Sequence, residues 1–272
     1  KERLPVLAVR DNVHFPLLVN TLLVVREPSL RAVRRSLEND RRILVLSQRD
    51  MSVDEPEVRD LASTGTMSEV LQASPLPDGS LRVVLRGSSR ARAVGLTRRS
   101  GSFWSEAIQL DEVDRDDSLK VEAQARIAVE TFERVVQLNK AIPPEALQGV
   151  IHAEGPGATA DAIAHHLPLT PPQKQRLLEE LSVGERLNEV LRLLLHEEQV
   201  LNLGSKIQRE VEASLGQSQR EFYLREQLKV IQNELMVRED RLGETEEYEA
   251  KITRCELPED CRDKVLYELR RL

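Results

Sequence analysis

The segment SQREFYLREQLKVIQNEL, residues 218–235, is charged and contains neither proline nor glycine. Its apolar residues recur every three or four positions, which is the spacing of one helix face. These residues are Leu224, Leu228, Ile231 and Leu235. Between residues 205 and 242, seven basic side chains accompany seven acidic ones, so the neighbouring faces are predicted to be solvated. The segment therefore predicts a long helix with one apolar seam of the a/d type, through which subunits would pair.

The sequence before this segment predicts a bundle of shorter helices, because apolar residues keep the helical spacing while prolines and glycines interrupt it. The predicted helices cover residues 119–138, a short stretch from Glu145, a stretch capped by Thr159 and ending near His166, residues 172–181, and a segment that starts at Val183. Gly155-Pro156-Gly157 is predicted to form a turn before the third of these helices. Residues 116–204 are thus expected to form an α-helical bundle.

The first 115 residues have a different pattern, in which short apolar runs alternate with turn residues. The predicted strands are residues 4–9, 21–25, 42–47, 64–72, 81–86, 90–96 and 102–110, with one helix at 29–37. Pro77-Asp78-Gly79 predicts a hairpin, since proline fixes φ and glycine allows a positive φ. The fold class is therefore predicted to be α+β, with a sheet of about six strands in a β-rich N-terminal lobe.

The remaining boundaries follow from glycine and proline positions. Gly243 is predicted to end the long helix, which gives it the range 205–243. Residues 244–272 are predicted to form another helical pair around Leu257-Pro258. The chain ends on Arg271-Leu272 without a cap or a polar tail, which predicts that further chain follows.

Charge is unevenly distributed along the 272 residues. The net charge is −7, but residues 1–100 hold 17 basic and 12 acidic side chains, so the acidic excess lies in the rest of the chain. This asymmetry favours separate modules and raises a nucleic-acid hypothesis for the lobe. Arg82, Arg86, Arg90 and Arg92 fall at spacings that put several of them on one sheet face. Phe15 is the one aromatic residue in residues 1–100, which argues against base stacking.

The sequence contains none of the motifs that carry common enzyme chemistry. No phosphate-binding loop, H-E-x-x-H zinc motif or G-x-S-x-G elbow occurs, and Cys255 and Cys261 lack the partners of a zinc site. His165-His166 stands at a predicted helix end, where a cation or a capping donor would be useful. We therefore predict no catalytic, cofactor-binding or metal-binding residue. The lack of a long apolar run and of a disulfide framework predicts a cytoplasmic protein without membrane partners.

Two apolar stretches fall in predicted loops and are candidates for contact with a polypeptide. The first is Phe15-Pro16-Leu17-Leu18, between two strands, and the second is Leu76-Pro77 at the hairpin tip. Apolar loop residues either pack under the sheet or are offered to a partner, and both alternatives stay open.

Several stretches resemble the Lon ATP-dependent proteases. They are LPVLAVRDNVHFP (4–16), LPDGSLRVVLRGSSRAR (76–92), LNKAIPPEAL (138–147), ADAIAHHLPL (160–169) and the opening segment 218–235. The likeness follows the family's order through essentially the whole chain. One departure is Gly155-Pro156, where the family often has Asp-Pro.

The resemblance implies a PUA-like lobe over residues 1–115, its helical bundle, a linking helix, and the start of an AAA+ module at 244–272. It also implies a homohexameric parent that uses ATP and Mg²⁺ and a Ser-Lys dyad located beyond Leu272 to degrade misfolded and regulatory proteins. This chain would then recognise unfolded or misfolded substrates and support assembly. DNA binding would be a property of the parent rather than of this chain. The alternatives are a PUA-like nucleic-acid-binding module and a scaffold for oligomerisation.

Overall fold

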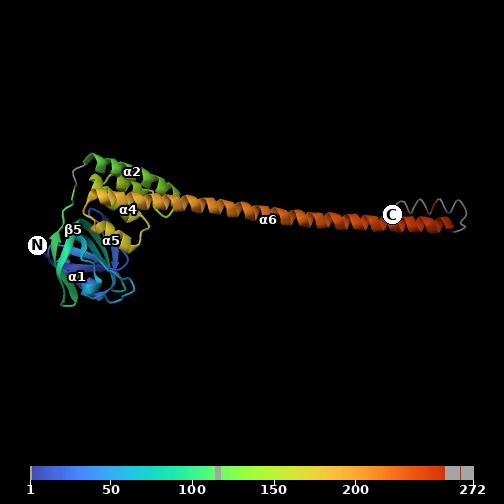
Figure 1. The fold of residues 1–272 in the computed structure, drawn as a ribbon. Helices are drawn as coiled ribbons and strands as arrows, with labels where there is room; N and C mark the ends of the chain where they lie inside the picture. The colour runs from blue at the N-terminus through green and yellow to red at the C-terminus, as the bar shows by residue number, and fades with distance from the viewer. Residues whose placement is uncertain (1, 114–117, 255–263, 265–272) are drawn as a thin grey trace. The chain divides into compact units, whose positions relative to one another are not determined.

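A computed structural model describes residues 2–113, 118–254 and 264, without the side chains of 118, 212–220, 233–249 and 253. Contacts divide the chain into two units, Lys1–Leu203 and Gly204–Leu272, which we describe separately. The elements, shown in Figure 1, are β1 (Glu2–Val9), β2 (Val19–Val24), α1 (Glu27–Glu38), β3 (Arg42–Ser47), a 3₁₀ turn η1 (Val58–Asp60), β4 (Thr64–Pro75), β5 (Leu81–Arg99), β6 (Ser102–Gln109), α2 (Ser118–Leu138), α3 (Glu145–Ile151), α4 (Gly155–His166), α5 (Pro171–Glu179) and α6 (Val183–Arg254). A β-rich lobe followed by helices confirms the predicted α+β class.

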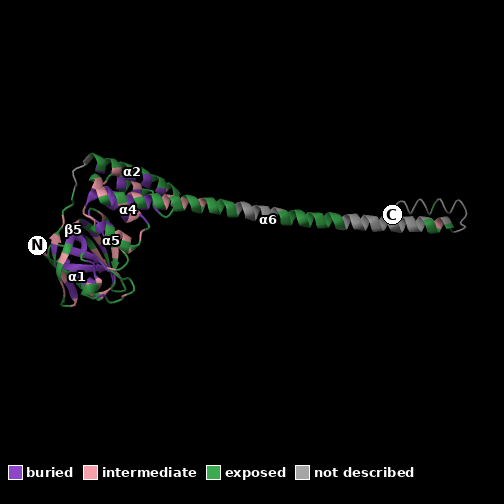
Figure 2. Cartoon of the chain, in the orientation of Figure 1, coloured by how far each residue is buried: buried purple, intermediate pink, exposed green. Residues whose placement is uncertain are grey.

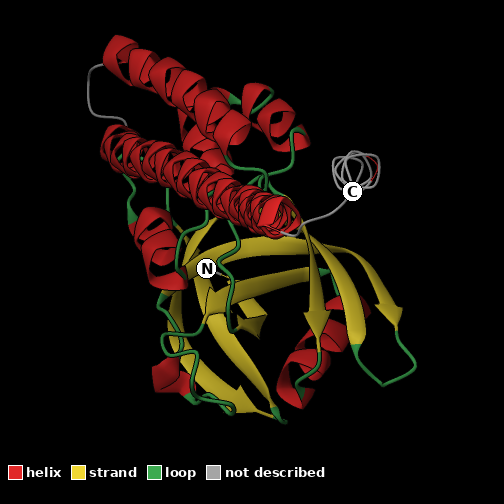
Figure 3. Cartoon of the chain, turned by 90° about the vertical axis from the view of Figure 1, so that its right-hand side faces the viewer, coloured by secondary structure: helices red, strands yellow, loops and turns green. Residues whose placement is uncertain are grey.

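The six strands form one sheet in the order β2-β5-β4-β3-β1-β6. The additional pairing of β5 with β6 closes β5, β4, β3, β1 and β6 into a barrel, and Figure 3 shows the curvature of these strands. β2 pairs with the first part of β5, at residues 81–86, and β6 pairs with its second part, at residues 91–99. Among the described strands, β2 is therefore the one outside the ring, with a single neighbour.

The hairpin between β4 and β5 confirms the predicted turn. Gly79 has a φ of 85°, and its N–H donates to the carbonyl oxygen of Leu76 at 3.0 Å. β5 differs from the prediction, because residues 81–86 and 90–96 belong to one strand. Gly87 lies inside it, and a Cβ at this position would collide with the backbone of Phe15. The glycine thus allows the loop before β2 to cross closely over an unbroken strand.

Three clusters of buried apolar side chains form the core of the first unit. One joins α1 to the strands, through residues such as Leu30, Val33 and Val83. A second lies within the barrel around Leu44, Leu46 and Phe103. The third is the core of the helical bundle, and it also includes Val13 and Phe15 from the loop between β1 and β2. Lobe and bundle thus share this third cluster through the loop between β1 and β2.

Two helix boundaries differ from the predictions. α4 already begins at Gly155, with Glu154 as its N-cap, so Gly155-Pro156-Gly157 is the first helical turn and not a turn before it. The Thr159 hydroxyl donates to the Gly155 carbonyl oxygen inside the helix and is not a cap.

α6 is the second correction, since it runs through Gly204, Gly216 and Gly243 to Arg254. The predicted end at Gly243 is therefore wrong: a single glycine costs about 1 kcal/mol, which a long helix tolerates. Figure 2 shows that buried residues are concentrated in the first unit, while the described side chains of α6 beyond Gly204 are almost all exposed. The expected AAA+ segment lies largely outside the described residues.

Candidate functional site

The predicted contact stretch between β1 and β2 divides into a buried and an exposed part. Phe15 is fully buried in the core shared by lobe and bundle, and Pro16 is buried beside it. These two residues therefore pack internally and leave the set of candidate contacts. Leu17 is 57% exposed with a φ of 61°, and Leu18 is half-buried.

At the hairpin tip, the two predicted contact residues differ in exposure. Pro77 is exposed and Leu76 is half-buried. The Asp78 carboxylate accepts hydrogen bonds from the side chain and the backbone of Ser80, which lowers the pKa of Asp78. The tip is thus a well-formed turn, and its role in binding stays a prediction.

The largest run of exposed apolar side chains on the lobe lies on β2 and was missed by the sequence reasoning. Side chains alternate along β2, with Asn20 and Val24 buried and Val19, Thr21 and Leu23 exposed; Val25, directly after the strand, is exposed as well. We call these four exposed residues the outer strip. Val19, Leu23 and Val25 are 57, 62 and 63% exposed, respectively. The strip was hidden in the sequence because Leu22 and Val24 are also apolar, so the run reads as buried on both faces.

Arginines border the outer strip on β5. Arg82 lies opposite Leu23, and Arg86 lies opposite Val19 and forms an ion pair with Glu69 at 2.6 Å. Arg90 does not belong to this exposed row, because it is buried. The predicted arginine face is therefore wrong at Arg90, which weakens the nucleic-acid alternative.

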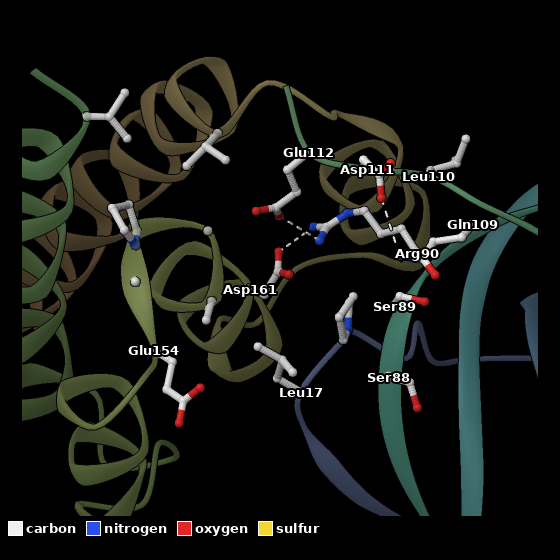
Figure 4. Close-up of a pocket in the computed structure, with 17 residues that line it drawn as sticks. Leu17, Ser88, Ser89, Arg90, Gln109, Leu110, Asp111, Glu112, Glu154 and Asp161 are labelled. Atoms are coloured by element: carbon white, nitrogen blue, oxygen red, sulfur yellow. Dashed lines mark hydrogen bonds and ion pairs between the residues drawn. The ribbon is translucent and has the colours of Figure 1, made fainter. Parts of the chain in front are cut away.

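Arg90 instead belongs to a cleft of about 460 Å³ between the lobe and the bundle. Its guanidinium donates to Asp161 of α4 at 2.6 Å and to Glu112 at 3.1 Å, and Figure 4 shows both carboxylates converging on it. Its Nε donates to the backbone oxygen of Leu178 at the end of α5. Arg186 of α6 is also fully buried and pairs with the same two carboxylates.

This network of two cations and two anions joins β5 to α4 and α6. Burial raises the pKa of Asp161, and the charges of Arg90 and Arg186 oppose that rise. Gly157 makes room for the Glu112 carboxylate at the first turn of α4, where the helix dipole favours a negative charge. Each charge is thus compensated by an opposite one, as a structural joint requires.

A group of imidazoles lies at the same joint. His14, next to Phe15, is buried; its Nδ1 is 2.9 Å from Asn20, and burial lowers its pKa to about 4. Burial also lowers the pKa of His165 to about 4 and the pKa of His166. Both residues lie in the last turn of α4, as predicted, and burial favours their neutral form over the cation. Lys174 donates to the His165 carbonyl oxygen at 2.7 Å.

Within the described residues, no group of three or more His, Cys, Asp or Glu side chains is placed to hold a metal ion. In the same part of the chain, no helix is long and apolar enough to cross a membrane. The outer strip and the exposed residues of α6 are open to a partner.

The predicted seam on α6 is exposed where the structure describes it. Leu224, Leu228 and Ile231 are each about half exposed, and Leu235 lies outside the described side chains. An apolar row on an otherwise charged helix is typical of a pairing surface. The pairing itself stays a prediction.

Comparison with known proteins places this chain in a family. A family model described as the "ATP-dependent protease La (LON) substrate-binding domain" matches residues 3–196. The Lon protease of Azospirillum brasilense is 40% identical over 268 residues, which cover 98% of this chain and 33% of that protein. The Lon protease of Escherichia coli (strain K12) is 36% identical over 269 residues, which cover 99% of this chain and 34% of that protein.

A solved structure supports the fold. The N terminal domain of Mycobacterium avium complex Lon protease superposes with a TM-score of 0.59 at 24% identity, covering 71% of this chain and 98% of that one. The chain spans about a third of the length of the curated relatives that it matches. These matches show that the chain belongs to the Lon protease family and corresponds to its N-terminal, substrate-binding region.

Proposed function

We propose that this chain recognises polypeptide substrates for a Lon-type ATP-dependent serine protease that degrades misfolded and regulatory proteins. The observation that carries the proposal is the outer strip of β2, an exposed apolar row on a domain that matches a substrate-binding family. Unfolded proteins expose apolar segments that folded proteins bury, so such a row favours them. ATP, Mg²⁺ and the catalytic dyad would belong to the rest of the parent.

The test compares one target protein in its native and its permanently unfolded form. Each form is titrated onto the 272-residue chain and onto a Leu23→Ser/Val25→Ser variant, with binding followed by fluorescence anisotropy. We expect the unfolded form to bind at least about tenfold more tightly than the native form, and the variant to lose about tenfold, which corresponds to 1.4 kcal/mol.

A matched control separates the strip from apolar surface in general. Ile127 on α2 is 52% exposed, so Ile127→Ser removes a comparable side chain elsewhere. This variant should bind like the unchanged chain. Equal affinity for native and unfolded target would contradict the proposal.

Exposed residues of the two predicted loops would extend this surface. Leu17, Leu18, Leu76 and Pro77 remain candidates, since none of them is fully buried. A Leu17→Ser/Leu76→Ser variant tests them in the same titration. Unchanged affinity would confine recognition to β2.

Assembly is a second proposed function, carried by the exposed row Leu224, Leu228 and Ile231. We propose that α6 pairs with α6 of neighbouring subunits in a hexameric, cytoplasmic parent. Sedimentation of this chain should show weak, concentration-dependent association that Leu224→Ser/Leu228→Ser removes, because short isolated seams are marginal. A stable hexamer of this chain, or association unaffected by the substitutions, would contradict the proposal.

A further inference from the structure

β2 offers more than an apolar face, because it also has an open edge. It ends the strand order of the sheet and pairs only with β5 among the described strands. We propose that an extended segment of an unfolded polypeptide binds as an additional strand along the free edge of β2, through main-chain hydrogen bonds. This inference rests on the proposed function and specifies how the substrate is held.

The hydrogen-bond register shows which backbone groups are free. The Gly87 N–H donates to the Leu18 carbonyl oxygen at 2.9 Å, and the Leu17 N–H donates to the Gly87 carbonyl oxygen at 3.0 Å. In an antiparallel pair, successive residues direct their backbone groups alternately toward and away from the partner. The register continues from Gly87 through the pairs Asn20↔Leu85 and Leu22↔Val83. The backbone N–H and C=O groups of the even-numbered residues of β2 therefore point toward β5. The N–H and C=O groups of Val19, Thr21 and Leu23 therefore point toward the free edge.

These groups have no other backbone partner in the part of the chain that the structure describes. An edge with unpaired donors and acceptors is a template for another strand, and proteins usually protect it with charges, prolines or bulges. Here the same residues carry Val, Thr and Leu side chains, which favour strands and offer no repulsion. The strip thus lacks the usual protection where it is most open.

Space and shape at the end of β2 fit a side chain of the added strand. A cavity of about 150 Å³ lies between residues 7–11 around the end of β1 and residues 22–26 around the end of β2. A cavity of this size holds about one aromatic ring. An added strand would direct alternate side chains to opposite faces, so one set would cover Leu23 and Val25 while the other approaches this cavity.

Charge restricts the occupant further. Arg82, opposite Leu23, has no ion pair among the described residues, and the Arg86 side chain is 56% exposed although it pairs with Glu69. An arginine side chain is long enough to reach across a neighbouring strand. The favoured occupant is therefore an extended segment with alternating apolar residues and nearby carboxylates, the pattern of a half-buried strand released by unfolding. A folded protein pairs most such strands internally and protects the edges that remain.

The decisive experiment removes main-chain donors from the ligand without changing its side chains. The probe is a fluorescein-labelled nine-residue peptide in which Val or Leu alternates with Ser or Glu. Two analogues carry N-methyl groups at the odd or at the even positions. Binding to the 272-residue chain is followed by anisotropy. We expect one analogue to lose about tenfold or more in affinity and the other to stay within about threefold, because only one edge of the peptide pairs with β2.

Changes in the protein complete the test. Leu23→Lys places a charge on the open edge and should weaken binding about tenfold, whereas Ile127→Lys on α2 should not. Hydrogen exchange should slow at the amides of Val19, Thr21 and Leu23 when peptide is bound. The amides of Asn20 and Leu22 should change little, because they already pair with β5.

Three outcomes overturn the inference. If both N-methylated analogues bind like the parent peptide while Leu23→Lys still weakens binding, side chains alone hold the substrate and the proposed function survives. If sedimentation shows a dimer that Leu23→Lys dissociates, the edge pairs with a second copy of this chain. If neither peptide nor unfolded protein binds, the proposed function fails as well.

Discussion

The joint between lobe and bundle and the outer strip of β2 distribute their side chains in opposite ways. The joint pairs four charged groups with one another: Arg90, Asp161 and Arg186 are buried, and Glu112 is partly exposed. The strip exposes Val and Leu side chains and an unpaired strand edge. Buried charges fix one arrangement, since separating them leaves charge without compensation. An exposed apolar edge gains stability only when a partner covers it. The two regions thus suit holding the domain together and binding a partner, respectively.

The largest effect should follow from breaking the charge network. Asp161→Ala leaves two buried guanidinium groups with less compensation and should lower the free energy of unfolding by about 3–5 kcal/mol. Urea denaturation followed by circular dichroism measures this. Glu189→Ala breaks the exposed ion pair with Arg192 and should change little. Similar losses in the two variants would show that burial does not set the importance of these pairs.

The imidazoles of the joint predict a dependence on pH. Burial lowers the pKa of His14 to about 4 in the folded chain. Between pH 6.5 and about 4, the unfolded chain therefore binds a proton at His14 that the folded chain does not bind. Its contribution is complete above pH 6.5 and is lost as the pH falls toward 4. His165, whose pKa is lowered by burial and then by the nearby charges of His166, Lys174 and His14, adds positive charge close to His14 when it is protonated.

The measurement compares the unchanged chain with His14→Asn by denaturation at pH 7 and pH 4.5. The unchanged chain should lose about 2 kcal/mol more than the variant over this range, since each unit of pKa shift is worth about 1.4 kcal/mol. Parallel losses would mean that His14 is not held neutral by the fold.

Gly87 connects the two regions, because the loop from the joint crosses β5 at this glycine on its way to β2. Gly87→Ala would push a Cβ into the backbone of Phe15 and should destabilise by about 1–3 kcal/mol. Gly149→Ala on α3 meets open space and should stabilise by about 0.5–1 kcal/mol. Thermal unfolding of both variants measures whether each substitution raises or lowers stability. A change in the same direction for both variants would contradict this packing.

The sequence predicted those elements of the fold that depend on residues close together in the chain. The hairpin at Pro77-Asp78-Gly79 and the helix α2 follow from turn chemistry and from periodicity, which are local properties. The buried role of Arg90 could not be predicted, because Asp161 lies 71 residues away in the chain. The outer strip was missed for a related reason. Which face of β2 is covered depends on the barrel and on the loop at Phe15, not on β2 itself.

The smallest change in stability should come from the strip, and it tests the comparison most directly. Leu23→Thr keeps a residue that favours strands at a position that is 62% exposed, so the free energy of unfolding should change by no more than about 0.5 kcal/mol. Binding of unfolded protein should still weaken, because a large apolar side chain is lost from the contact. Asp161→Ala, measured below its unfolding transition, should show the reverse: a large loss of stability with little loss of affinity. A strip that lowered stability and affinity together would be part of the folded core, and its exposure would then not indicate a binding surface.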